Sequence, residues 1–426
     1  MKKSRNFGKK LLLVAIFSST AEAKNFGGHI FVSTGESDNA EKTIVDPVSE
    51  RQDSYELGLS GEYDNSFLST SIDYSGTDNR FAENSQRDQR YLEGESMLRL
   101  GSPTDPMDIE FNHSRKTLLS SPDEIDITNN QDEREILSAT PRIKKHISDA
   151  DLLVVSADFS DINFLESDIN DSERQTAILA WNRSSSKISQ FNVQLQHADV
   201  KFPSSENANY TYTAAVVTYA IELRKLEYTV AAGYNRSERE TQGSFGKPTY
   251  TLSVGYNSGF NSFLLMGSQA ITDSSYGGGN IRGVNQNPTS DGRFRVDQIQ
   301  RRNAELSWTN KFLCIRCTMR MSLHQSNDDY VVLHDEIRQQ GGRVDFPYNF
   351  CTQSSLTLGY GVSEHKFAGT LTGRDYQLDS ASIQYRYLFN SGMSVRLFAD
   401  KENRESDSGA RTYDETFIGA ALGYYF

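Results

Sequence analysis

Apolar and polar residues alternate along most of this 426-residue chain. In the stretch SYELGLSGEY, for example, Leu57 and Leu59 fall on one face and Glu56 falls on the other. The same two-residue period recurs in residues 189–199, 225–234, 251–256, 354–360, 381–387 and 418–426. This period is typical of β-strands with one apolar face, whereas the 3.6-residue period of helices is almost absent. The pattern therefore predicts an all-β fold.

Two architectures fit many alternating strands: a soluble sandwich or propeller with its apolar face inward, or a membrane barrel with its apolar face outward. The lengths of the connections separate the two. Short turns are predicted at residues 64–66, 102–105, 184–186, 257–259 and 390–392. Longer polar segments lie between them, at residues 36–52, 76–88, 116–132, 237–246 and 272–295. Tight turns that alternate with longer loops are typical of outer-membrane barrels.

The segments amount to about 20 strands, within a range of roughly 16 to 22, each long enough to cross a bilayer at a tilt. An even count returns both ends of the chain to one side of the membrane. The two faces are mixed in residues 29–35, 132–144 and 334–348, so the strand assignment is weakest there. We predict a transmembrane antiparallel β-barrel that spans residues 24–426.

The first 23 residues have the layout of a signal peptide. A basic stretch, MKKSRNFGKK, precedes the apolar run Leu11–Phe17, and Ala21 and Ala23 form a small-x-small cleavage site. No apolar run reaches the ~18 residues of a transmembrane helix. We therefore predict that residues 1–23 are removed and that the mature chain lies beyond the inner membrane.

Removal of this segment takes away five basic residues and one acidic residue, so the formal net charge falls from -13 to -17. Such an acidic chain is a poor partner for nucleic acid. Acidic clusters at residues 121–135 and 160–174 suggest Ca²⁺, or lipopolysaccharide bridged through Ca²⁺. Neither cluster has the spacing of a dedicated calcium loop, which favours ordinary solvated loops. We predict no cofactor and no resident metal.

Aromatic residues next to predicted turns suggest contact with the lipid-water boundary, where a ring with a polar tip is well placed. The alternative is that tyrosine simply favours strands. The residues concerned are Tyr63, Tyr74, Tyr234, Tyr256, Tyr360 and Tyr387.

The chain ends on the strand-like stretch ALGYYF, in which Leu422, Tyr424 and Phe426 share one face. An open sheet edge in hydrocarbon would leave backbone groups unpaired, at several kcal/mol each. A final strand without a polar tail is expected if it closes the barrel against the first strand.

This ending resembles the C-terminal signature of outer-membrane barrel proteins, which implies recognition by the barrel-assembly machinery through strand addition. The whole layout resembles the outer-membrane β-barrel proteins associated with exopolysaccharide and PEP-CTERM sorting loci. That resemblance covers nearly all of the mature chain and rests on its layout and on the stretches Leu59–Gly76 and Ser138–Ser160. It implies a Gram-negative outer membrane, its lipid and lipopolysaccharide, and exopolysaccharide or export components as partners. It implies no mechanism.

The predicted lumen is the first candidate site. Inward positions with charge are Glu56, Glu62, Asp73, Glu93, Glu95, Arg99, Asp108, Glu110, Glu305, Arg386 and Arg396, of which we select Glu93, Glu95, Arg99, Glu305, Arg386 and Arg396 as lumen-lining residues. Mixed charge in a wide barrel can set a transverse field and select polar solutes. Alternatively, a wet lumen tolerates any polar residue and opposite charges merely pair.

Two further features leave alternatives open. The glycine-rich segment Asp273–Gly292 lacks the strand, helix and GK[ST] ending of a phosphate loop, and is either a flexible outer loop or an inward constriction. Cys314 and Cys317, if on a strand, point to opposite faces about 10 Å apart, beyond disulfide reach. A bridge from Cys314 to Cys351 would require the backbone to bend.

Catalysis has one candidate, His324, with Asp328 and Asp329 nearby, but no G-x-S-x-G or HExxH element accompanies it. We predict that the protein is not an enzyme. The leading prediction is a conduit for polar solutes, linked through the resemblance to exopolysaccharide export. A structural or assembly protein of the envelope with a closed pore is the alternative, followed by an enzyme on a barrel scaffold.

Overall fold

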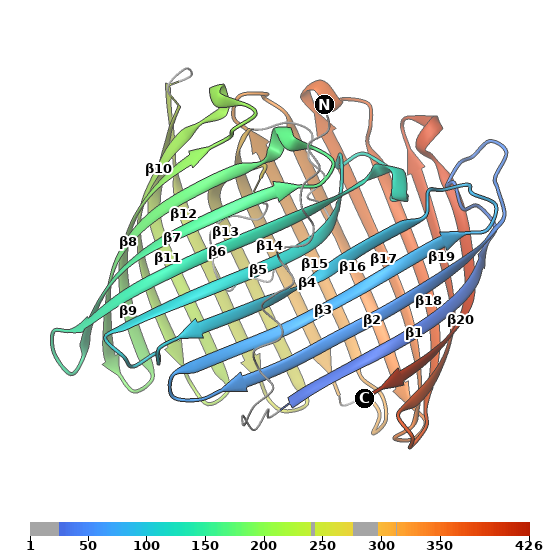
Figure 1. Cartoon of the computed structure of the whole chain (residues 1–426), viewed down its shortest axis with the longest axis horizontal. Coiled ribbons are helices and arrows are strands. Elements are labelled where there is room, and N and C mark those ends of the chain that lie inside the picture. Colours follow the sequence, from blue (N-terminus) through green and yellow to red (C-terminus); the bar gives the residue numbers. More distant parts are fainter. Residues whose placement is uncertain (1–24, 240–242, 276–296, 312) are drawn as a thin grey trace, which may run out of the picture.

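The computed structural model describes residues 25–239, 243–275, 297–311 and 313–426, so the predicted signal peptide and its cleavage site lie outside the described residues. Within these ranges the chain forms 20 strands in one antiparallel sheet (Figure 1). Their bounds are β1 (Asn25–Ser37), β2 (Glu50–Asp64), β3 (Leu68–Phe81), β4 (Gln89–Leu100), β5 (Met107–Leu119), β6 (Gln131–His146), β7 (Asp151–Phe164), β8 (Ser172–Ser186), β9 (Ser189–Lys201), β10 (Tyr210–Glu222), β11 (Leu226–Arg239), β12 (Gly243–Asn257), β13 (Asn261–Asp273), β14 (Gln298–Asn310), β15 (Met319–Tyr330), β16 (Glu336–Asn349), β17 (Ser354–Ala368), β18 (Tyr376–Leu388), β19 (Met393–Ser406) and β20 (Tyr413–Tyr425).

Short 3-10 turns occupy several of the connections. They are η2 (Thr128–Asn130), η3 (Asp168–Asn170), η4 (Glu206–Ala208), η5 (Gly369–Leu371) and η6 (Gly409–Arg411). No helix in the described ranges is long and apolar enough to cross a membrane.

The sheet closes on itself because the last strand pairs with the first. The ladder between β1 and β20 runs from His29 opposite Tyr425 to Ser37 opposite Phe417. At its end, the Gly28 N–H donates to the Phe426 carbonyl at 2.8 Å, and the Phe426 N–H donates to the Gly28 carbonyl at 3.0 Å. The predicted fold class, a closed antiparallel barrel of about 20 strands, is confirmed.

The two ends of the barrel differ in their connections. β1 begins and β20 ends at the same end, which we call the turn end (Figure 1). The connections there are short, whereas the opposite loop end carries longer ones, such as residues 38–49 and 120–130. One predicted long loop, residues 237–246, is wrong, because β11 and β12 stay paired up to Arg239 opposite Gly243. The three segments with mixed faces form parts of β1, β6 and β16.

Contacts across the barrel identify the inner face. Arg174 on β8 is ion-paired with Asp273 on β13, although β9 to β12 lie between them in the wall. Such a contact crosses the interior, so the face that carries Arg174 lines the lumen. Carried from strand to strand by the register, the opposite, outer face contains Leu57 and Leu59, which are 49% and 51% exposed. The apolar side of the alternation thus faces outward.

The six tyrosines predicted near turns all lie on this outer face. Tyr63, Tyr256 and Tyr387 are close to the turn end of their strands. The prediction is wrong in detail for the other three, Tyr74, Tyr234 and Tyr360, which lie well inside β3, β11 and β17 because these strands extend further than the pattern indicated.

The cysteines differ from the prediction. β15 begins only at Met319, so Cys314 and Cys317 lie in the turn between β14 and β15 rather than on a strand. The turn brings their Cα atoms to 5.2 Å, and the two are joined by a disulfide. Cys351, in the turn between β16 and β17, is free and exposed, so the bridge from Cys314 to Cys351 does not form.

This arrangement predicts the reactivity of the thiols. Folded protein in detergent should take up one maleimide, at Cys351, and three after reduction and unfolding, as measured by intact mass. In the C351S variant, the unreduced protein should take up none. Uptake of three maleimides without reductant would contradict the disulfide in the turn.

Candidate functional site: the lumen and its covered mouth

The selected lumen residues lie on the inner face but on separate parts of the wall. The register places Glu93, Glu95 and Arg99 on β4, Glu305 on β14, and Arg386 and Arg396 on β18 and β19. They do not converge on one point. Arg99 Nη2 donates to Glu110 Oε2 at 2.8 Å, and Glu93 accepts the Thr117 N–H at 2.9 Å.

Two sectors of the wall carry opposite charge. On β3 and β4, Asp73 stands directly opposite Glu95, and both side chains are exposed. On β18 and β19, Arg386 stands directly opposite Arg396. The strands β1, β2 and β20 lie between these like-charged pairs. Charged pairs of opposite sign therefore stand on neighbouring parts of the inner wall.

Arg396 is held by an aromatic ring. Its guanidinium lies 4.8 Å from the centroid of Phe31 on β1, and its buried Nε has no hydrogen-bond partner among the described residues. A cation over a ring face is stabilised by the ring quadrupole. The remaining N–H groups of the guanidinium are then available to an anion in the lumen.

At the loop end, the hairpin of β13 and β14 bends into the barrel. The ladder between β12 and β13 ends at Tyr250 opposite Gln269, although β13 continues to Asp273. At the point of separation, Thr249 Oγ1 donates to the Gln269 carbonyl at 2.7 Å, and Gln269 Nε2 donates to the Pro248 carbonyl at 2.7 Å. The end of β13, from Ala270 to Asp273, therefore leaves the wall and turns inward.

One end of the β13–β14 connection is fixed by Asp273, whose side chain is fully buried. Arg174 on β8 and Tyr210 on β10 both donate to its carboxylate. Next to it, Ser172 Oγ donates to Ser275 Oγ at 2.8 Å. Strands β8 and β10 thus hold the start of the β13–β14 connection.

The other end of the connection is fixed by Asp297, which is also buried. Arg239 Nη2 on β11 donates to its Oδ1 at 3.0 Å, and the Val332 and Leu333 N–H groups donate to its Oδ2 at 2.9 and 3.0 Å. Most of the predicted glycine-rich segment, Asp273–Gly292, lies outside the described residues. Asp273, the first residue of that segment, and Asp297, which precedes β14, are both held inside the barrel.

A second group of contacts at the loop end involves the β5–β6 connection. Asp123, between β5 and β6, is buried and receives Arg374 Nη1 at 2.7 Å, and also Arg411. Arg404 on β19 donates to the carbonyls of Asp123 at 2.6 Å and Glu124 at 2.8 Å. The solvated loop predicted for residues 121–135 is therefore wrong near its start, because Arg374 and Arg411 from two later connections bury the Asp123 carboxylate.

Lys42 in the β1–β2 connection completes this side of the mouth. Its Nζ lies 2.7 Å from Glu402 Oε1 and 3.4 Å from Glu415 Oε2. Burial alone would lower the pKa of Lys42, but the Glu402 and Glu415 carboxylates and the Tyr413 hydroxyl outweigh it and hold the pKa above its ordinary value. The ion pair is therefore intact throughout the neutral and mildly alkaline range.

Apolar side chains fill the space beneath these connections. Three clusters of buried residues lie at the loop end, in contrast to the polar walls further down. Their central members are Ile299, Tyr330, Ile337, Phe367, Leu371 and Tyr376; Val200, Phe202, Ala208 and Tyr210; and Leu118, Ile162 and Phe164. The mouth at the loop end is therefore narrowed by packed side chains.

The proposed catalytic group is not assembled. His324 lies in the middle of β15, on the inner face opposite Glu305. Asp328 is ion-paired with Arg301, with its Oδ1 2.7 Å from Arg301 Nε. Asp329 points outward and is paired with Arg302. Neither aspartate is therefore available to His324.

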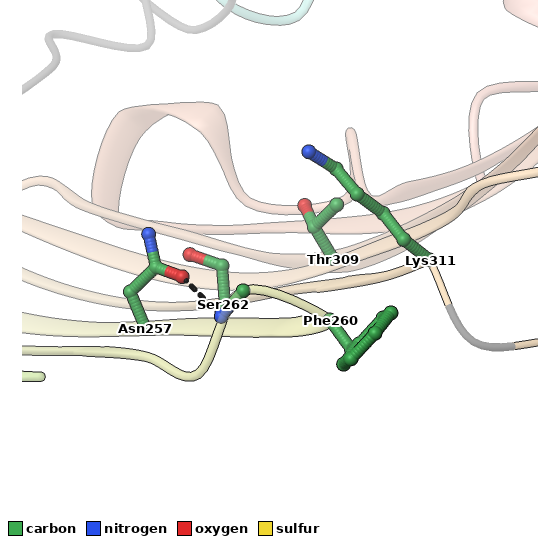
Figure 2. A pocket seen from close by; sticks show the side chains of 6 residues that line it. Asn257, Phe260, Ser262, Thr309 and Lys311 are labelled. Carbon is green, nitrogen blue, oxygen red and sulfur yellow. Dashed lines mark hydrogen bonds between the residues drawn. The ribbon is translucent and has the colours of Figure 1, made fainter.

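A shallow pocket at the turn end offers no further chemistry. It is lined by Asn257, Gly259, Phe260, Ser262, Thr309 and Lys311 (Figure 2). Asn257 Oδ1 accepts the Gly259 N–H at 2.8 Å, as is usual in a turn. Lys311 is the sole titratable side chain of this lining, so the pocket lacks an acid-base pair.

No protein-family model matches the chain, and no curated protein matches its sequence. Solved structures do match its fold. The FrpB iron transporter from Neisseria meningitidis (F5-1 variant) is 10% identical, with 95% of this chain and 83% of that chain covered and a TM-score of 0.51.

The siderophore receptor PirA from Acinetobacter baumannii is 11% identical over 96% of this chain and 81% of that chain, with a TM-score of 0.48. The outer membrane protein OpdK from Pseudomonas aeruginosa is 10% identical over 95% of this chain and all of that chain, with a TM-score of 0.41. At these identities, the similarity to FrpB shows a shared barrel fold and nothing about function.

Proposed function

We propose that this protein is an outer-membrane conduit for polar solutes, with the turn end in the periplasm and the loop end outside. The observation that carries the proposal is the closed barrel with exposed apolar side chains outside and charged, exposed side chains inside. A wall of this kind satisfies every backbone group within hydrocarbon and encloses water. A barrel beyond about 16 strands is wide enough for an aqueous channel.

The comparisons support the proposal at the level of fold, since an iron transporter shares this barrel. Lipopolysaccharide and outer-membrane lipid would surround the outer face. The barrel-assembly machinery would recognise Leu422 and Tyr424 of β20 and Phe426, which follows it. Exopolysaccharide or its export components are the solute and partners that the sequence resemblance suggests. All of these partners are proposals.

A second candidate is a structural or assembly protein of the envelope whose pore stays closed. The packed mouth favours it, because the β5–β6 connection and the described ends of the β13–β14 connection are held at the loop end by buried ion pairs. The two candidates differ in one measurable property, the passage of ions.

Conductance in planar bilayers separates the candidates. Refolded protein should give discrete conductance steps, and the double variant R174A/R239A should give larger or more frequent ones, because both ends of the β13–β14 connection lose their buried partners. The variant R236A, on the outer face of β11, is the matched control and should behave as the parent. Absence of conductance steps in both the parent and R174A/R239A would support the closed envelope protein.

Contact of the outer face with lipid can be tested by placing a charge there. Ile418 is an exposed outer residue of β20. I418R should lower the free energy of unfolding in lipid vesicles by about 2–4 kcal/mol if the site lies near the bilayer midplane. Q194R, on the polar inner face of β9, should cost far less in the same urea titration. Equal costs at the two positions would speak against a lipid-facing outer wall.

A further inference from the structure

Four aromatic side chains follow one another along the inner wall where the first and last strands meet. In order from the turn end, they are Tyr425 on β20, Phe31 on β1, Phe398 on β19 and Phe417 on β20. Phe31 and Phe398 stand opposite Gly423 and Gly419, which share the inner face of β20 with the other two. We call these four residues the aromatic track.

Glycines let these rings lie against the wall. A Cβ at Gly419 would lie 2.5 Å from Phe398 Cζ, and a Cβ at Gly35 would lie 2.5 Å from Phe417 Cζ. The ring of Phe31 occupies the same space above Gly423. The rings of Phe31, Phe398 and Phe417 therefore cover backbone of the neighbouring strand.

The rings form two contacting pairs. The centroids of Phe398 and Phe417 are 5.7 Å apart, and those of Phe31 and Tyr425 are 5.4 Å apart. On another wall, the inner face of β9 alternates amides at Gln190, Asn192, Gln194 and Gln196, as a water-filled lumen requires. An apolar path along one wall of a polar lumen is a surface on which a ligand can stack.

Cationic groups lie beside the turn-end half of the track, whereas Asp400 stands opposite Phe417 in the other half. Arg396 stacks its guanidinium over Phe31, and Arg386 stands opposite Arg396 in the ladder. Within the described part of the chain, neither Arg386 nor Arg396 forms an ion pair with a carboxylate. A guanidinium binds a carboxylate through two parallel N–H groups, and the neighbouring ring keeps that fork oriented.

We propose that the aromatic track and these two arginines bind an acidic oligosaccharide, a chain of sugar rings that carry carboxylates. The apolar C–H faces of the sugar rings stack on Phe398 and Phe417, because the face of an aromatic ring is negative and attracts C–H groups. The carboxylates bind Arg386 and Arg396. The inference rests on the proposed conduit and names the class of solute that would pass along its wall.

The test is equilibrium binding to the refolded protein in detergent by calorimetry, with a hexamer of galacturonic acid and with maltohexaose as the neutral probe. The acidic hexamer should bind more tightly than maltohexaose, and the difference should shrink at high salt. F398L keeps an apolar side chain over Gly419 but removes the ring, and should weaken both sugars by roughly three- to tenfold. R386Q should weaken the acidic hexamer alone.

The control variant Q194A, on the inner face of β9, should bind as the parent does, and heat-modifiable migration in gels checks that every variant is folded. Absence of binding by the folded parent would overturn the inference, as would unchanged affinity in F398L. Equal binding of both sugars, unaffected by R386Q, would overturn its acidic specificity. Binding in detergent requires no ion flow. Absence of conductance in planar bilayers would therefore count against the proposed conduit without deciding whether the aromatic track binds sugar.

Discussion

The hydrogen bonds between β1 and β20 are the constraint on which the rest of the structure depends. A backbone N–H or C=O left unpaired in hydrocarbon costs several kcal/mol, so a sheet exposed to lipid must have no edge. Closure of an antiparallel sheet with 20 strands places the start of β1 and the end of β20 on one side. It also forces connections to alternate between the two ends, so that one end can keep tight turns while the other accumulates longer segments.

Those longer segments meet a second constraint at the loop end. Asp123, Asp273 and Asp297 are buried, and a buried carboxylate is tolerated only when cations or N–H groups satisfy it. Loss of one member of a buried ion pair typically costs about 3–5 kcal/mol, because the other charge stays behind. Each carboxylate is matched by arginines from distant strands or connections, so the segments at the mouth are fixed at defined points.

The sequence predicts the strands, because a period of two is a local pattern. The polar segments between the strands then predict the alternation of connections, and the apolar alternation of residues 418–426 predicts a closing strand. The sequence does not predict the partners of Asp273 or Asp123, since Arg174 and Arg411 are remote in the chain and only the register brings them close. The prediction for the cysteines is wrong for a different reason: it placed Cys314 and Cys317 on a strand, whereas they occupy a turn. Of the selected lumen residues, Arg386 and Arg396 suggest a binding site only once the structure places Phe31 beside Arg396. The alternation of the sequence does not distinguish Phe31 from other strand residues.

The position of the aromatic track at the seam has a consequence for biogenesis. Its four rings come from β1, β19 and β20, the elements made first and last, so no partial chain possesses it. A barrel that stalls with its seam open keeps the Phe398–Phe417 pair of β19 and β20 but lacks the contacts of Phe31 with Tyr425 and Arg396. Full ligand recognition would therefore be reached only after the seam has closed.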